Sequence, residues 1–240
     1  PTEVFTVGGR SIRLLCREKG VEDGSKLEDD TGLDFWPRAA TQLCQVVVER
    51  LDGNAAARNL SVIELGAGIG TVGIFVSKIG VAHVTLTDFE DAVLQMLTAN
   101  VTLNDATSQC IVKRLDWRDT GATAIPPCDI VLGSDILYHA CLVEPLLGAV
   151  QATLGPSGAF LLAHVHRRSL FMSRGQPQIE DTDVVLDTFL DRATASGLSH
   201  IVVHTQGERL GADGPCQVLA FFRDVSPPWL ANKEHKQEPR

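Results

Sequence analysis

Short apolar runs alternate with longer amphipathic segments over most of the chain. The runs have the length and composition of buried β-strands and comprise Val62–Leu65, Ala82–Thr87, Cys110–Arg114, Asp129–Gly133, Ala159–Val165, His200–His204 and Gln217–Phe222. The amphipathic segments predict helices at Pro37–Arg50, Thr71–Ile79, Asp91–Leu103, Leu142–Leu154 and Asp183–Ser196. Strand–helix alternation of this kind is typical of a parallel sheet with helices on both faces.

Both ends of the pattern depart from this alternation. No helix separates the last two runs, so we expect them to pair antiparallel. Near the N-terminus, Gly8 and Gly9 separate the β-like runs Val4–Val7 and Ser11–Arg17, as in a tight hairpin. The prediction is therefore an α/β fold: a doubly wound, Rossmann-like, mostly parallel seven-stranded sheet that ends in an antiparallel hairpin, with an N-terminal β-hairpin.

Length and composition fit one soluble domain. The chain has 240 residues, of which 44% are hydrophobic and 21% charged. We divide it into a hairpin extension (1–20), the main domain (21–224) and a polar tail (225–240), which is expected to be disordered from Ser226. The net charge of -9 disfavours a nucleic-acid partner, because phosphate binding needs a basic surface.

The cysteines and the apolar runs indicate where the protein works. Six cysteines lie far apart without a C-x-x-C pair, as expected of buried thiols in a reducing compartment. No apolar run reaches the length of a membrane span, and we expect no signal peptide. We expect a cytoplasmic monomer without a membrane partner, with the nucleus as a second location.

A glycine-rich turn follows the first buried run of the main domain. It reads Glu64-Leu65-Gly66-Ala67-Gly68-Ile69-Gly70 and leads into a helix. Glycines let the backbone approach a ligand closely, and the helix N-terminus faces that ligand. Asp88 ends the next strand, where a carboxylate can accept hydrogen bonds from ribose hydroxyls. The pattern predicts a pocket for an adenosine-containing cofactor, although such a turn can also serve only to pack a strand on a helix.

The spacing of the turn distinguishes between cofactors. A dinucleotide fingerprint, G-x-G-x-x-G, would place a glycine where this chain has Thr71. Glu64 would repel a pyrophosphate, and it suits a cofactor with a cationic amino-acid tail. E-x-G-x-G-x-G resembles motif I of the class I methyltransferases, whose cofactor is S-adenosylmethionine. An NAD-dependent oxidoreductase is the remaining alternative of this kind.

Two further polar sites follow predicted strands, at the sheet edge where ligands of such folds bind. After the third strand, the Asp116 carboxylate can bond an adenine amine and the Trp117 indole can cover the ring. After the fourth come Ser134, Asp135 and Tyr138, where an acceptor would meet the cofactor. The alternatives are a packing role for Trp117 and a helix N-cap role for Asp135.

Together these motifs resemble the protein-lysine branch of the seven-β-strand methyltransferases over residues 1 to 224. The matching motifs are Asp34-Phe35-Trp36-Pro37, Gly66-Ala67-Gly68, Thr87-Asp88, Leu115-Asp116-Trp117 and the D-x-x-Y element within Gly133-Ser134-Asp135-Ile136-Leu137-Tyr138. By this resemblance, the cofactor is lined by Trp36, Gly66–Gly68, Asp88, Trp117 and Ser134. Asp135 and Tyr138 border the acceptor, a lysine of a protein substrate. Pro37 departs from many relatives, which leaves the role of Trp36 open.

Other functions are weighed against this one. The family also contains histidine methylators, and small-molecule methylation is a further alternative. Enzymes that methylate bases resemble one another in a [DNS]-P-P-[YF] loop, and here Ile136 and Leu137 replace the prolines. A catalytically dead binding module is disfavoured by four intact site residues: Gly66, Asp88, Trp117 and Asp135.

Three charged features remain. The acidic run from Glu22 to Asp34 is either a solvated linker or an entrance that attracts a basic substrate. The segment His164–Arg174 contains three arginines and is either a solvated loop or one that faces substrate. His164 and His166 share a strand face, but without a third ligand at suitable spacing we expect no metal site.

Overall fold

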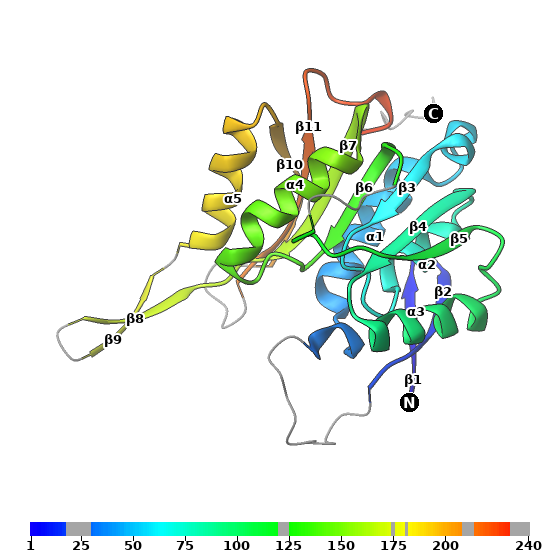
Figure 1. Cartoon of the computed structure of the whole chain (residues 1–240), viewed down its shortest axis with the longest axis horizontal. Coiled ribbons are helices and arrows are strands. Elements are labelled where there is room, and N and C mark those ends of the chain that lie inside the picture. Colours follow the sequence, from blue (N-terminus) through cyan, green and yellow to red (C-terminus); the bar gives the residue numbers. More distant parts are fainter. Residues whose placement is uncertain (18–29, 120–124, 174–175, 181, 208–213, 231–240) are drawn as a thin grey trace, which may run out of the picture.

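A seven-stranded sheet forms the centre of the molecule (Figure 1). The computed structural model describes residues 1–17, 30–119, 125–173, 176–180, 182–207 and 214–230. The sheet strands are β3 (Ser61–Glu64), β4 (His83–Asp88), β5 (Cys110–Arg114), β6 (Cys128–Ser134), β7 (Leu154–Val165), β10 (Ser199–Gln206) and β11 (Cys216–Phe222). Each of the seven predicted strands is present. Strand β7 begins at Leu154, well before the predicted Ala159, and the ends of the other strands differ by two residues at most.

The strand order is β10-β11-β7-β6-β3-β4-β5. The neighbours from β7 to β5 pair parallel, whereas β11 pairs antiparallel with both β7 and β10. Strand order reverses beside β3, so a crevice opens at the carboxyl ends of β3, β4 and β6. The mostly parallel sheet with an antiparallel final hairpin is confirmed.

Helices cover both faces of the sheet (Figure 1). The bounds are α1 (Pro37–Leu51), α2 (Thr71–Lys78), α3 (Asp91–Leu103), α4 (Val143–Thr153) and α5 (Val184–Ala195), with 3-10 turns at Asp30–Leu33, Ala55–Asn59, Ala140–Leu142 and Pro228–Leu230. Alternate residues of each strand enter different cores: Val62 packs with α1 and α2, and Ile63 packs with α4 and α5. Two separate apolar layers therefore hold the strand that leads into the glycine turn.

The predicted N-terminal hairpin is present as β1 (Thr2–Val7) and β2 (Arg10–Leu15). It forms a separate sheet, and Phe5 and Ile12 are buried against the α1–α2 side of the core. The Asn100 side chain, buried in α3, accepts from Leu15 N at 2.7 Å and donates to the carbonyls of Leu15 and Ile69. A single amide thus joins the hairpin to the loop that begins α2, a long-range contact that the sequence pattern does not reveal.

Two segments differ from the prediction. The expected loop after β7 contains a hairpin, β8 (Ser169–Ser173) and β9 (Gln176–Glu180), which projects from the sheet in Figure 1. Each of these strands has five residues, and they pair antiparallel with each other. The expected disorder from Ser226 is wrong as far as residue 230, because Leu230 is buried in the core beside the turn Pro228–Leu230.

None of the helices in the described ranges combines the length and apolar character that a membrane crossing requires.

Candidate active site

A cavity of about 330 Å³ opens at the carboxyl ends of β3, β4 and β6. Residues predicted from the sequence line it from both sides: Trp36, Glu64, Gly66, Ala67, Gly68, Asp88, Asp116, Trp117, Ser134, Asp135 and Tyr138. Arg118, Leu142 and Arg167 also line it and were not among the predicted site residues. The structure therefore brings every predicted residue to one cavity.

The glycine turn forms the floor of the cavity. Gly66 and Gly68 have φ angles of 61° and 53°, a left-handed region that disfavours other residues. A Cβ atom at Gly68 would lie 3.0 Å from the carbonyl oxygen of Gly32. Ala67 N donates to Thr87 O at 2.8 Å, and Gly68 N donates to Asp88 Oδ2 at 2.9 Å. These bonds fix the turn against the end of β4.

Asp88 stands at the point where β4 enters the cavity. Burial raises the pKa of its carboxyl, while hydrogen bonds from the N–H groups of Gly68, Phe89 and Glu90 oppose this rise. A carboxylate has about four lone-pair sites, so acceptor capacity remains beside these three donors. The geometry suits a ligand with paired hydroxyl groups.

Glu64 is 2% exposed, and its Oε2 accepts from Gly73 N at 2.8 Å. Burial is the main cause that raises the pKa of Glu64 to about 8; the Gly73 bond lowers it and the Asp88 charge raises it. At pH 7 the side chain is therefore mostly neutral until a cation approaches. The sequence predicts that Glu64 is ionised and therefore repels phosphates. The raised pKa corrects this prediction, because the side chain carries little charge at pH 7 without a cationic ligand. Gly73 was missed, although only a glycine leaves room for the carboxyl there.

Trp117 and Asp116 form one wall. The Trp117 ring lies against Gly66, since a Cβ atom there would be 3.1 Å from its Cζ2 atom. Asp116 accepts two hydrogen bonds of 2.9 Å from the guanidinium of Arg118, and these bonds are the main cause that lowers its pKa. Arg118 also lies over the Phe89 ring at 4.9 Å. An adenine amine would therefore compete with this ion pair for Asp116.

Trp36 marks the opposite wall. It precedes α1, and 55% of its surface is exposed although it lines the cavity. Beside it, Asp34 pairs with Arg17 at 2.7 Å. Most of the acidic run lies outside the described residues: Glu22, Asp23, Lys26, Glu28 and Asp29.

Asp135 occupies the end of the cavity where β6 stops. Its φ of 56° is left-handed, a conformation that costs free energy in a residue other than glycine and often marks a functional position. Its Oδ2 lies 2.9 Å from Arg167 Nη2, and its Oδ1 accepts from Val165 N at 3.4 Å. The following turn and α4 have His139 and Leu142 at their N-caps, so Asp135 is not a helix cap.

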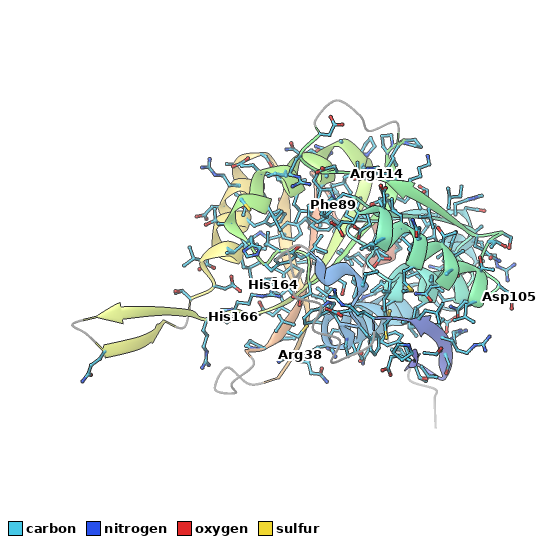
Figure 2. The ribbon with its side chains drawn as sticks, turned by 60° about the horizontal axis from the view of Figure 1, so that its bottom comes forward. Arg38, Phe89, Asp105, Arg114, His164 and His166 are labelled. Carbon is cyan, nitrogen blue, oxygen red and sulfur yellow. The ribbon has the colours of Figure 1, made fainter. Side chains whose placement is uncertain are left out.

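A buried pair supports this end of the site. His164 Nε2 lies 2.7 Å from Asp183 Oδ2, and the side chains are 1% and 2% exposed. Burial would raise the pKa of Asp183, but hydrogen bonds from His164 and from the N–H groups of Arg167 and Leu186 lower it to about 2. Figure 2 shows His164 and His166 near the base of the projecting hairpin. Within the described ranges, no group of three acidic, histidine or cysteine side chains could hold a metal ion.

Comparison with known proteins settles the family. A family model described as lysine methyltransferase matches residues 20–174, more than half of the chain. The chain belongs to the lysine methyltransferase family. The resemblance to the protein-lysine branch of the class I enzymes is thereby confirmed. All residues that line the cavity, from Gly32 to Arg167, lie within the matched segment.

Individual relatives agree with the family. EEF1A lysine methyltransferase 3 of Xenopus tropicalis is 38% identical over 110 residues, covering 45% of this chain and 47% of that protein. Protein N-lysine methyltransferase METTL21A of Mus musculus is 34% identical over 115 residues, covering 46% and 52%. The matched segments span about half the length of these curated relatives.

Solved structures share the fold at low identity. A ribosomal protein L11 methylase from Lactobacillus delbrueckii subsp. bulgaricus has a TM-score of 0.57 at 19% identity, covering 82% of this chain and 84% of that chain. M. jannaschii TYW2, in complex with AdoMet, has a TM-score of 0.55 at 15% identity, covering 93% and 87%. At this identity, the likeness establishes the Rossmann-like fold alone.

Proposed function

We propose that this member of the family transfers a methyl group from S-adenosylmethionine to a lysine side chain of a protein. The observation that carries the proposal is a cavity that extends from the glycine turn to Asp135, with a buried acid at one end and an ion-paired acid at the other. Two of the curated relatives are named as lysine methyltransferases, which supports the same acceptor.

The residues present fit this cofactor. Gly66 and Gly68 line the cavity in the left-handed conformation that the turn requires, with Trp117 and Gly32 packed close against them. Asp88 has the lone pairs to accept from ribose hydroxyls, and Trp117 offers an aromatic face beside Gly66. Within the described ranges Glu64 makes no ion pair, and a cationic amino-acid tail would supply one. When bound, S-adenosylmethionine provides a methyl group on a positively charged sulfur, which retains the electron pair of the broken S–C bond.

The acceptor nitrogen has to arrive neutral, because its lone pair forms the new N–C bond. A free lysine has a pKa of about 10.4, so the neutral form at pH 7 costs about 4–5 kcal/mol. Asp135 would orient the amine through its carboxylate oxygens, with proton loss to water. Tyr138 and Leu142 border the same end and would exclude water around the amine.

Calorimetric titration and label transfer together test this proposal. We expect S-adenosylmethionine and S-adenosylhomocysteine to bind and NAD to bind poorly. Asp88→Ala should weaken cofactor binding by about 1.5–3 kcal/mol, since it removes hydrogen bonds to a charged group. Label from the cofactor should enter the protein fraction of an extract and resist nuclease. Tight NAD binding without S-adenosylmethionine binding, or label confined to nucleic acid, contradicts the proposal.

We also propose a cytoplasmic location and a monomeric state. The support is that one relative is named for EEF1A and that the described chain forms the cavity without a second copy. Size-exclusion chromatography with light scattering tests the monomer, and a dimer would contradict it.

A further inference from the structure

At the acceptor end of the cavity, the positive charge of Arg167 neutralises the negative charge of Asp135. An unpaired carboxylate next to the acceptor would hold the incoming lysine as an ammonium, because an opposite charge favours the charged form. An ammonium has no free lone pair and cannot accept a methyl group. In this structure the carboxylate is paired, since Arg167 Nη2 lies 2.9 Å from Asp135 Oδ2.

Arg167 is held in place from several directions. Its Nη1 donates to Val165 O at 3.1 Å, and its backbone N donates to Asp183 Oδ2 at 2.6 Å. Asp183 is buried, bonds His164, and caps α5 by accepting from Leu186 N at 3.0 Å. The guanidinium therefore stands on an anchored segment, although its own side chain is 37% exposed.

The carboxylate is also fixed. Asp135 N donates to Ala163 O at 2.8 Å, and the left-handed backbone turns the residue back toward the end of β7. With Oδ1 facing Val165 N and Oδ2 facing Arg167, the carboxylate retains lone pairs for an amine but carries a compensated charge.

We propose that Arg167 is a positioning residue that keeps Asp135 from holding the substrate lysine as its ammonium, so that the amine is presented neutral. This inference rests on the proposed function. Arg167 acts through Asp135: it leaves the hydrogen-bond acceptor in place and cancels the charge that would trap a proton. The proton of the incoming ammonium leaves to water before the N–C bond forms.

Other titratable and charged groups lie near the ion pair of Asp135 and Arg167. Asp183 has a pKa of about 2 and remains ionised. Burial raises the pKa of Cys216 to about 11, helped by the Asp135 charge and opposed by Arg38, so the thiol stays protonated. His164 contacts Asp183. The pH series should end near pH ~9, below the pKa of about 10 of an ordinary phenol.

The test is the pH profile of turnover at saturating cofactor for wild type, Arg167→Gln and Arg167→Lys. Removing the compensating charge should move the rising limb of log kcat for Arg167→Gln toward higher pH by about one to two units. At pH 7 kcat should fall about 10-fold or more, with KM for substrate unchanged or lower, and the deficit should shrink as pH rises. Arg167→Lys should recover most of the wild-type profile, because it retains the charge.

Arg192→Gln serves as the matched control, since Arg192 lies in an exposed ion pair with Glu144 at 3.2 Å on the outer helices. It should leave the profile unchanged. A loss of turnover in Arg167→Gln that is equal at every pH, or no loss at all, overturns the role of Arg167 while wild-type methylation stands. Absence of methylation by the wild type in the same series overturns the proposed function itself.

Discussion

The carboxyl of Glu64 and the backbone N–H of Gly73 are joined by a hydrogen bond of 2.8 Å in the interior of the protein. This bond is the main stabilising contact described for an acid whose pKa is about 8. An ordinary glutamate has a pKa near ~4.3. The folded protein therefore retains a proton that the unfolded chain loses over this interval.

The first prediction concerns stability against pH. Between about pH 4.5 and about pH 8 the unfolded chain binds fewer protons at this site, so stability falls as pH rises. From about pH 5.5 to about pH 7.5 the effect should reach roughly 2–3 kcal/mol. Glu64→Gln, which cannot ionise, should remove that part of the slope. Urea unfolding of both proteins without ligand measures it, and equal slopes would show that Glu64 does not titrate in this interval.

A second prediction follows for ligand binding. A cationic amino-acid tail near Glu64 favours its ionised form, so binding of S-adenosylmethionine at pH 7 should release a proton. Titration in buffers with different ionisation enthalpies should give heats that depend on the buffer for wild type. For Glu64→Gln this dependence should be largely lost. Heats independent of buffer in the wild type would place the cationic tail elsewhere.

The third prediction compares two glycines. A Cβ atom at Gly73 would lie 2.0 Å from Leu86 Cδ2 and 2.6 Å from Glu64 Oε2, whereas nothing lies within 4 Å of one at Gly148. Gly73→Ala should therefore destabilise the fold by about 1–3 kcal/mol through overpacking. Gly148→Ala, in an exposed part of α4, should stabilise it by up to about 1 kcal/mol through helix propensity. Thermal unfolding of both variants measures these changes in stability. An unchanged stability of Gly73→Ala would contradict the close packing around Gly73.

A fourth prediction separates binding from chemistry. Asp135→Ala should leave cofactor affinity nearly unchanged and reduce turnover by 10²-fold or more, about 2.7 kcal/mol. Trp117→Ala should weaken cofactor binding and leave turnover largely recoverable at saturating cofactor, because the indole lies beside Gly66. Calorimetry and kinetics on both variants give the comparison. Near-normal turnover in Asp135→Ala would move the acceptor site away from this residue.

Much of the fold and site could be predicted because local patterns determine them. Apolar runs located each sheet strand, and the glycines between Glu64 and Gly70 located the floor of the cavity. What was missed depends on partners distant in sequence. Gly73 reads as an ordinary helix residue until Glu64 is placed against it, and the Asn100 amide bonds a strand 85 positions away.

Arg167 shows the same limit. In the sequence it is one arginine in a basic segment, indistinguishable from a solvated side chain. The pairing of β6 with β7 brings the Arg167 side chain to Asp135, and the buried Asp183 accepts a hydrogen bond from the Arg167 backbone N–H. Neither contact can be read from the sequence. The charge of Asp116 could be read from the sequence, whereas its engagement by Arg118 could not.

The most direct test is to locate the transferred methyl group. The purified protein is incubated with labelled S-adenosylmethionine and a protein extract, and labelled peptides are sequenced by mass spectrometry. The methyl group should be found on the Nζ atom of a protein lysine with the wild type, and be lost with Asp135→Ala. Label on histidine, on a small molecule or on nucleic acid, or lysine label that persists unchanged in Asp135→Ala, would contradict lysine methylation at this cavity.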